Sequence, residues 1–320
     1  MFEYLKSLTS RSEPETAKLE KYIRKAYTRD PSIKPFADGG ANTLPPTLRR
    51  DRKNRVIYYI GTFNPPHRGH LALLNHVYQH SRDAAGFHAV AVIVMAHGQS
   101  WADRKVRDDA KPLRLTFDQR LRLLEDGLDA HAAKDTRSRL WVMPRDVNGW
   151  WAFQARLNAA CAKDGFALEF HELLGPDYVK LSGPQCFAWH GVVTSNICRP
   201  ADFDADGGGQ QPPLPLAGFH PWQQERQQGL TDEPAEDGEG DTDPTSGDEA
   251  WMCYMRTEGP RKGYSVRYIR SRQPSMDPDM SSSKLRSIIA ESPPDELAEN
   301  LCGLATNPEL LIQIMKECTV

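Results

Sequence analysis

Two histidines, His67 and His70, are the residues whose types and spacing best suit chemistry. They lie three residues apart, so a single helical turn would place both imidazoles on the same side. If a helix starts beside them, its free amides contribute to an anion site through their geometry and dipole. A bound polyphosphate would raise the pKa of both rings and favour the charged, donating form. The alternative is a pair of surface histidines on a capped helix.

A second group suited to phosphate lies near the other end of the chain, where Ser281, Ser282 and Ser283 precede Arg286. Consecutive serines at a helix start offer hydroxyls and free amides together. Arg286 would lie one turn inside that helix and could fork onto phosphate oxygens. Taken alone, the pattern is that of an ordinary helix cap. Taken with the histidine pair, it predicts that two helix N-termini bind one triphosphate between them.

The elements expected to position the histidines form a strand, a turn and a helix. The β-branched and aromatic run 56–60 predicts a buried strand. Gly61 then permits a tight turn and close approach of the backbone to a ligand. Pro65 and Pro66 exclude helix at the residues before them, so regular helix should begin near Gly69. The polar groups therefore lie at the turn.

Further strand and helix patterns alternate along the chain. Strands are expected at 88–95, 140–143, 167–174, 190–199, 251–255 and 265–269, and helices after Thr116 and over 152–163. The apolar run 88–95 is continuous, which is typical of parallel strands covered on both faces. We therefore predict a Rossmann-like, doubly wound α/β fold with five or six parallel strands. Its site should lie beyond the carboxyl ends of the strands.

The turn segment Gly61-Thr-Phe-Asn-Pro-Pro-His-Arg-Gly-His70 resembles the G-x-F-x-P-x-H-x-G-H signature of the nucleotidyltransferase superfamily. Its Phe-Asn-Pro form is most similar to nicotinamide mononucleotide adenylyltransferases, in their eukaryotic, fungal-like form. The segment 280–286 resembles the I-S-S-T-x-x-R motif of the same superfamily, with Met280 in place of isoleucine and Ser283 in place of threonine. The resemblance spans residues 55–200 and 251–320.

The resemblance implies adenylyl transfer from ATP to nicotinamide mononucleotide, giving NAD and pyrophosphate, with Mg²⁺ bound through the ATP phosphates. The implied catalytic residues are His67, His70 and Arg286. The implied ATP-binding residues are Gly61, Thr62, Phe63, Gly69, Asp177, Ser282 and Ser283. The implied acceptor-nucleotide-binding residues are Asn64, Trp150, Trp151 and Arg199. No protein metal ligand is expected.

Several of these assignments carry an alternative. Trp150 or Trp151 could stack on a planar, charged nicotinamide, or either could pack in the core. Asp177 could accept hydrogen bonds from a ribose, but Pro176 departs from the family's G-x-D element and leaves a simple turn as the other interpretation. Arg199 could reach the acceptor phosphate or lie on the rim. The family's phosphate-binding lysine corresponds to Lys105 or Lys111, in a polar loop after residue 96.

Composition limits the other classes of function. The chain has 320 residues and a formal net charge of −3, which argues against a general nucleic-acid binder. No apolar run approaches the length of a membrane span, and neither a secretory nor a mitochondrial leader is evident. The six cysteines lack C-x-x-C spacing, so free thiols in the cytoplasm or nucleus are expected. These cysteines are Cys161, Cys186, Cys198, Cys253, Cys302 and Cys318.

Four segments are expected along the chain. Residues 1–50 form an extension with one amphipathic helix and a linker. The catalytic domain occupies 51–200 and 251–320, and it is split by an acidic, Gly- and Pro-rich insertion, 201–250, which is expected to be disordered. Homo-oligomerisation and a protein partner for the insertion remain open.

Two rival functions remain open as well. The chain could transfer a nucleotide to another phosphate, as pantetheine-phosphate adenylyltransferases and cytidylyltransferases do. It could instead bind or hydrolyse ATP as a regulatory or interaction protein. Assays with ATP or CTP against a panel of phosphorylated acceptors discriminate among these.

Overall fold

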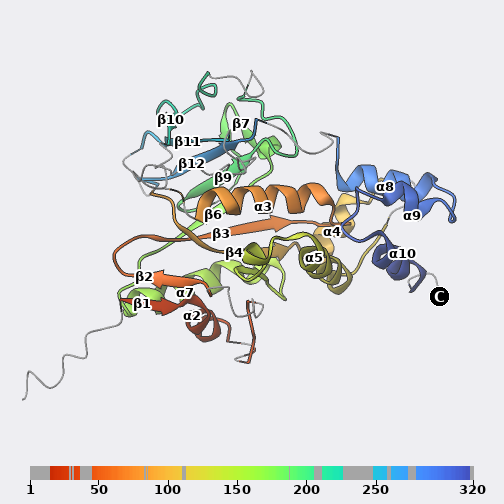
Figure 1. Ribbon diagram of the computed structural model, residues 1–320, viewed down its shortest axis with the longest axis horizontal. Coiled ribbons are helices and arrows are strands. Elements are labelled where there is room, and N and C mark those ends of the chain that lie inside the picture. Colours follow the sequence, from red (N-terminus) through yellow and green to blue (C-terminus); the bar gives the residue numbers. More distant parts are fainter. Residues whose placement is uncertain are drawn as a thin grey trace, which may run out of the picture.

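An eight-stranded sheet forms the centre of the protein in the computed structural model (Figure 1). The structure describes residues 15–28, 30, 32–36, 45–82, 84, 86–109, 113–186, 188–204, 211–225, 248–257, 261–272 and 279–317. The sheet strands are β3 (Asn54–Gly61), β4 (Ala89–Ala96), β5 (Leu140–Val142), β6 (Leu168–Leu173), β9 (Gly191–Ser195), β10 (Gln223–Gln224), β11 (Glu249–Tyr254) and β12 (Ser265–Arg270). Two short pairs lie outside it: β1 (Thr16–Lys18) with β2 (Thr47–Arg49), and β7 (Val179–Lys180) with β8 (Gly183–Pro184).

The strand order is β10-β11-β12-β9-β6-β3-β4-β5. All neighbours from β12 to β5 are parallel, and β11 and β10 add an antiparallel edge. The chain moves outward from β3 through β4 to β5 and then returns to the other side of β3 with β6. The order reverses between β3 and β6, and such switch points are where open α/β sheets bind ligands. The predicted Rossmann-like fold is confirmed.

The helices lie on both faces of the sheet. They are α2 (Leu19–Ala26), α3 (Arg68–Arg82), α4 (Gln99–Lys105), α5 (Phe117–His131), α6 (Lys134–Arg137), α7 (Trp150–Lys163), α8 (Ser282–Glu291), α9 (Leu297–Leu301) and α10 (Pro308–Glu317). Side chains of β3 alternate between two cores, because successive residues of a strand face opposite ways. Val56 and Tyr58 pack with α2 and α7, whereas Ile57 and Tyr59 pack with α3 and α5.

The expected amphipathic helix of the extension is α2, which packs on the face of the sheet that α7 covers. Tyr22 meets Phe166 edge-on at 5.9 Å, and Tyr27 meets Trp141 at 5.7 Å. Arg156 of α7 donates a hydrogen bond to the carbonyl of Ala26. These contacts make the helix part of the main core.

The insertion expected at 201–250 does not behave as one disordered segment in its described parts. Residues 201–204 and 211–225 pack against the antiparallel edge, where Phe203 stacks on Trp222 at 5.6 Å. Asp204 is buried and accepts hydrogen bonds from Arg270 and Tyr268. The composition was therefore misleading here, because a few aromatic side chains and one buried ion pair hold the segment to the sheet. Residues 205–210 and 226–247 lie outside the described residues.

Two further differences from the sequence-based expectations concern local structure. The polar loop expected at 96–101 contains a short helix, α4, which starts after Gly98. The helix expected to start at residue 152 starts at Trp150. Five cysteines of the described residues (Cys161, Cys186, Cys198, Cys253 and Cys302) are free thiols, and Cys318 lies outside the described residues. None of the described helices is long and apolar enough to cross a membrane.

Candidate active site at the carboxyl ends of the strands

The turn after β3 is tightly folded. Phe63 has a φ of 49°, and its buried ring lies over Gly61. A Cβ at Gly61 would lie 2.5 Å from that ring, so only glycine leaves room for it. Gly61, which was expected to allow close approach of a ligand, thus makes room for the Phe63 ring in this structure. A nucleotide that contacts the Gly61 backbone would require the ring to move.

His67 and His70 lie together, as the spacing predicts. Their rings stack with centroids 3.6 Å apart, and His70 also meets the edge of Phe63 at 5.0 Å. Nδ1 of His70 accepts a hydrogen bond from the backbone N–H of His67 at 3.2 Å. A neutral His70 therefore carries its proton on Nε2, where it can donate to an anion. Nδ1 of His67 is buried, and the described part of the chain offers it no hydrogen-bond partner.

Burial controls the charge of both rings. Desolvation, with a smaller effect from Arg199, lowers the pKa of His67 to about 3. Desolvation, followed by the charges of His67, Lys105 and Arg199, lowers the pKa of His70 well below its ordinary value. Both rings are neutral at neutral pH in the absence of an anion, because burial, and to a smaller extent the nearby cationic groups, disfavours the charged form. The same cationic surroundings favour a polyphosphate.

The segment near the carboxyl end of the chain packs directly on this turn. The Met280 sulfur accepts a hydrogen bond from the Gly69 N–H at 3.0 Å, and the Ser282 hydroxyl donates to the Pro65 carbonyl at 2.8 Å. Arg286 donates through Nη1 to the carbonyl of Asn64 at 3.0 Å. Figure 1 shows β3 pointing toward α4 and α8. The two polar segments, far apart in sequence, thus meet at one end of the sheet.

Arg286 is held by an ion pair that the sequence did not indicate. Its Nε lies 2.6 Å from Oδ2 of Asp109, and its Nη2 donates to the Ser283 hydroxyl. The Arg286 side chain is 9% exposed, and that of Asp109 is 32% exposed. Such a charge-assisted bond is worth about 1.5–3 kcal/mol. A phosphate that binds Arg286 would have to compete with Asp109.

Asp177 and Arg199 also lie at this end of the sheet, after β6 and β9. Arg199 contacts Oδ2 of Asp177 at 3.3 Å and donates to the carbonyl of Met280 at 3.2 Å. Arg199 therefore links the Gly175-Pro-Asp turn to the start of α8. A Cβ at Gly175 would lie 2.6 Å from Oδ1 of Asp177, which explains the glycine of this turn.

Arg120 is a site residue that sequence reasoning missed. It is fully buried on α5, and its Nη1 donates to the carbonyls of Thr62 at 2.7 Å and His97 at 2.9 Å. It thereby holds the turn after β3 to the end of β4. Within the residues that the structure describes, its Nε and Nη2 have no hydrogen-bond partner, and burial lowers its pKa. An arginine among the inward-facing leucines of the predicted helix was the available signal.

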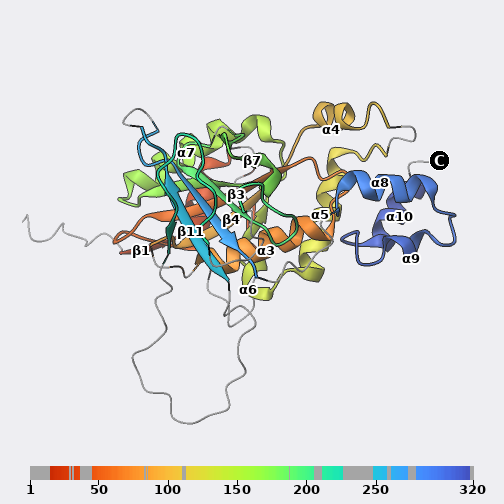
Figure 2. The same ribbon diagram turned by 90° about the horizontal axis from the view of Figure 1, so that it is seen from above.

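The loop at Leu304 and Ala305 is a second missed contact. Arg68 N–H donates to the Leu304 carbonyl at 2.9 Å, and His67 forms an isolated β-bridge with Ala305. The turn that carries the histidines is therefore supported by the small core of α8, α9 and α10, which lie together at one end of the molecule (Figure 2). No polar side chain marks this support, so the sequence held no signal for it.

Two residues assigned to the acceptor nucleotide have structural roles instead. Trp150 is fully buried, and its ring lies 4.8 Å from Tyr58 and 5.7 Å from Phe170. Core packing was one of the two alternatives that the sequence allowed for Trp150. The residue adopts it because it lies at the start of α7 and faces the sheet. Asn64 is 2% exposed, and its side chain bonds the backbone of Leu113 and Leu115.

Trp151 and the two candidate lysines differ from Trp150 and Asn64 in their exposure or position. Trp151 is 44% exposed, so its ring faces are accessible. Lys105 ends α4 close enough to His70 to lower the pKa of that ring. Lys111 lies outside the described residues. Between the two lysines, the structure thus gives a position at the site only for Lys105.

A cavity of about 420 Å³ opens beside this end of the sheet, after β5. It is lined by Pro144, Arg145, Asp146, Asn148 and Gly149. The loop after β4 adjoins it, because a Cβ at Gly98 would lie 2.9 Å from Oδ2 of Asp146. The cavity lies beyond the carboxyl end of a parallel strand, where such sheets bind ligands.

Part of the chain is similar to a known family. Residues 58–147, from β3 to the loop after β5, match the family described as cytidylyltransferase-like. The match covers less than half of the chain, and it supports a nucleotidyltransferase fold for this segment. Its site residues on β3, α3 and α4 lie inside the matched region, whereas Asp177, Arg199 and the start of α8 lie outside it. No curated protein matches the chain.

Two similar solved structures are of Plasmodium falciparum nicotinic acid mononucleotide adenylyltransferase, complexed with APC and with NaAD. Each is 12% identical to this chain, with a TM-score of 0.29, and the alignment covers 44% of this chain. It covers 63% and 64% of those chains, so this protein spans less than two thirds of their length. A likeness of this extent carries no information about the substrate.

The buried neutral histidines predict acid destabilisation. Burial lowers the pKa of His67 to about 3 and that of His171 to about 4, from an ordinary 6.5. Below pH 6.5 the unfolded chain binds protons that the folded chain does not, so stability falls with pH until the folded pKa is reached. At pH 5 each ring should reduce the free energy of unfolding by about 2 kcal/mol.

Urea unfolding at pH 7, 6 and 5 measures this effect. His171→Phe should remove about one ring's share of the pH dependence. A free energy of unfolding that is unchanged between pH 7 and 5 would contradict the neutral assignment.

Proposed function

We propose that this nucleotidyltransferase is a nicotinamide-nucleotide adenylyltransferase, which forms NAD and pyrophosphate from ATP and nicotinamide mononucleotide. The observation that carries the proposal is the meeting of the Gly61–His70 turn with the start of α8. Their bonds join Gly69 to Met280 and Asn64 to Arg286. A triphosphate held there would lie at the switch point between β3 and β6.

In this proposal the protein positions two nucleotides and neutralises charge, and it forms no covalent intermediate. The acceptor's 5′-phosphate oxygen attacks the α-phosphorus of ATP, the bond to the β-phosphate oxygen breaks, and pyrophosphate leaves. The Nε2–H of His70 would donate to the phosphates as charge develops. Arg286, Ser282 and Ser283 would hold the β- and γ-phosphates.

The acceptor is assigned from the Phe63-Asn64-Pro65 sequence and from the space beyond β5. One short segment, 146–151, carries both features. Asp146 and Asn148 line the cavity, and the exposed ring of Trp151 lies at the other end of the segment. A planar, charged pyridine ring suits an aromatic face. The distinction between nicotinamide and nicotinic acid mononucleotide is left to the assay.

In this proposal Mg²⁺ would bind to the ATP phosphates. Mg²⁺ commonly keeps several waters and binds through substrate phosphates with few protein ligands, so the proposal gives the ion no protein cage. The ion would neutralise phosphate charge. Cytoplasmic or nuclear location and a homo-oligomer remain predictions of the sequence.

An assay of the purified full chain tests the proposal. ATP and CTP should be offered separately with nicotinamide mononucleotide, nicotinic acid mononucleotide and pantetheine phosphate. We expect pyrophosphate release and a dinucleotide product with ATP and a pyridine mononucleotide. Formation of product with another acceptor or with CTP would support nucleotidyl transfer but contradict the proposed substrates. ATP binding without transfer to any acceptor would favour a regulatory or interaction role.

The Asp109–Arg286 pair predicts a variant with tighter ATP binding. Asp109→Asn removes the charge that occupies the guanidinium, so ATP should bind several-fold to about tenfold more tightly, a difference of about 1 kcal/mol. Calorimetric titration with a non-hydrolysable ATP analogue measures the dissociation constant. Asp108→Asn is the matched control, because its side chain is exposed and adjacent. Equal affinities for the two variants would show that Asp109 does not compete with phosphate.

A further inference from the structure

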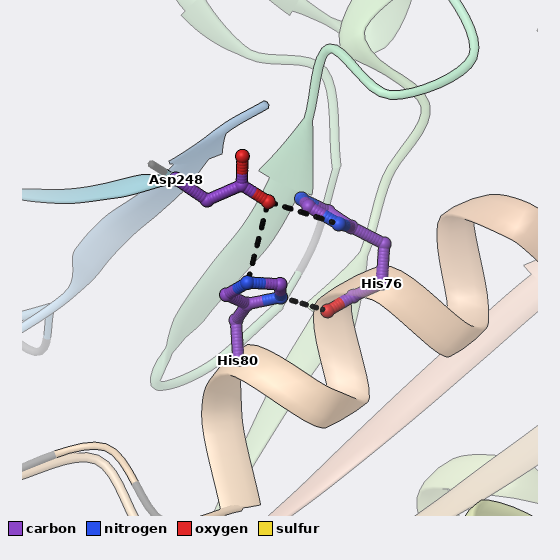
Figure 3. Close-up of side chains that lie close together, drawn as sticks. All are labelled: His76, His80 and Asp248. Atoms are coloured by element: carbon purple, nitrogen blue, oxygen red, sulfur yellow. Dashed lines mark hydrogen bonds and ion pairs between the residues drawn. The ribbon is translucent and has the colours of Figure 1, made fainter. Parts of the chain in front are cut away.

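Three side chains away from the nucleotide site form a compact group with metal-binding chemistry. His76 and His80 lie on α3, and Asp248 lies just before β11 (Figure 3). One ligand atom from each of the three lies within 4.8 Å of the others. We propose that His76, His80 and Asp248 bind a divalent transition-metal ion, with Zn²⁺ as the expected ion.

The separations between the ligand atoms suit a shared ion. Nε2 of His80 lies 3.3 Å from Oδ2 of Asp248, and Nδ1 of His76 lies 3.7 Å from the same oxygen. Ligands at the usual zinc distances of about 2.0–2.2 Å lie roughly 3.3–3.5 Å apart in a tetrahedron. The group therefore requires only small side-chain adjustments to coordinate one ion.

Two of the three side chains are oriented by secondary contacts. Nδ1 of His80 lies 2.9 Å from the carbonyl of His76, so a proton on Nδ1 leaves Nε2 bare toward Asp248. Oδ1 of Asp248 accepts from the backbone N–H of Arg272 at 3.2 Å, which directs Oδ2 toward the histidines. Metal-binding histidines and carboxylates are typically oriented by such bonds.

The third ligand is buried with an unmet hydrogen-bonding group. The His76 side chain is 9% exposed, and its Nε2 has no hydrogen-bond partner among the described residues. Its Nδ1, which faces Oδ2 of Asp248, is the atom offered to the ion.

The surrounding charges permit a cation. Arg267 lies close, donating through Nη2 to the His80 carbonyl at 2.9 Å and through Nη1 to the Ser81 hydroxyl at 2.7 Å. Its charge is compensated by Glu225, whose carboxylate lies 2.8 Å from Nη2. The Asp248 carboxylate supplies negative charge beside the two imidazoles.

The ligand types select the ion. Two imidazoles and one carboxylate suit Zn²⁺ and its first-row neighbours, whereas Mg²⁺ and Ca²⁺ prefer oxygen ligands. Three protein ligands leave a fourth position for water or a small anion. The bound ion would join α3 to the point where the chain re-enters the sheet at β11. His76 lies six residues beyond His70, about 9 Å along the same helix.

Tag-free full-length protein, freed of metal with EDTA, provides the test. ZnCl₂ should bind at one equivalent by calorimetry and raise Tm by several degrees. Co²⁺ should give the visible absorption of a four-coordinate nitrogen and oxygen site. Millimolar Mg²⁺ should not compete. Absence of a Zn²⁺ equivalent, or a cobalt–thiolate charge-transfer band, would overturn the assignment.

Variants locate the site. His80→Gln and Asp248→Asn should each weaken Zn²⁺ binding by about 100-fold or more, because loss of orienting partners alone costs about 10–100-fold. His220→Asn, an exposed histidine outside the group, is the control and should bind as the wild type does. The Tm of each variant in EDTA checks its fold. Unchanged Zn²⁺ affinity in a folded Asp248→Asn variant would overturn the proposal, whatever the nucleotide site does.

Discussion

His70→Asn should lower kcat for dinucleotide formation by about 10²–10³, the usual cost of removing one donor to a developing oxyanion. Asparagine can keep an acceptor near the position of Nδ1, which bonds the His67 N–H. It cannot place a donor where Nε2–H lies. The variant therefore removes the proposed phosphate contact while it retains the bond that shapes the turn. Steady-state kinetics with ATP and the acceptor measure the effect.

His70→Gln is the matched comparison. Glutamine can present an N–H near the Nε2 position but not the acceptor at Nδ1, so it should retain more activity than asparagine if the donor matters. Thermal unfolding of both variants checks that the packing against Phe63 survives. Equal kcat for His70→Asn and the wild type would remove His70 from the chemistry.

Arg286→Lys should lower kcat/KM for ATP by about 10²-fold. Lysine keeps the charge, but it cannot form the fork that two phosphate oxygens require. The loss should appear in kcat/KM for ATP and much less in KM for the acceptor. Varying each substrate in turn separates the two values.

The double variant Arg286→Lys/Asp109→Asn distinguishes a phosphate contact from a structural one. Arg286 also holds Asp109 and the Asn64 carbonyl, so its replacement could act through the fold alone. If the lost pair with Asp109 were the cause, removing the Asp109 charge should restore activity. We expect no restoration, because the fork onto phosphate is still missing. Recovery to within a few-fold of the wild type would reassign Arg286 to a structural role.

The structure shows the proposed nucleotide site in a compact arrangement. Phe63 covers Gly61, and Asp109 occupies Arg286. Both obstacles are side chains that can turn away, whereas the backbone turn behind them is held by Arg120 and by the Leu304 carbonyl. Binding energy from the nucleotides would then be used in part to displace two side chains on a preformed frame.

The antiparallel edge shows where composition alone was insufficient. Residues 211–225 are rich in Pro, Gly and Gln, which favoured disorder, yet Trp222 and Phe219 are buried there. Their burial depends on β11 and β12, which come much later in the chain. Arg267 and Arg270 of β12 also find their carboxylate partners, Glu225 and Asp204, in this segment. Local sequence cannot anticipate partners at such separation.

The proposed metal-binding group of His76, His80 and Asp248 also depends on residues that are distant in sequence. His76 and His80 are separated by one helical turn, so their common face is readable from the sequence. Asp248 joins them only because β11 lies beside β12 at the sheet edge near α3. The sequence analysis expected no protein metal ligand, because helical spacing relates only the two histidines and the fold alone brings Asp248 to them.

The sequence by itself determined the strand, the turn and the helix of the proposed site, together with the residue types that they carry. The apolar run of β3, the glycine and prolines of the turn, and the histidine spacing are local features, because strand, turn and helix propensities act over a few residues. The tertiary structure alone decided that Arg286 pairs with Asp109, that Arg120 supports the Thr62 carbonyl, and that Trp150 lies in the core. Each of these depends on which elements pack together, and packing joins residues that no local pattern relates.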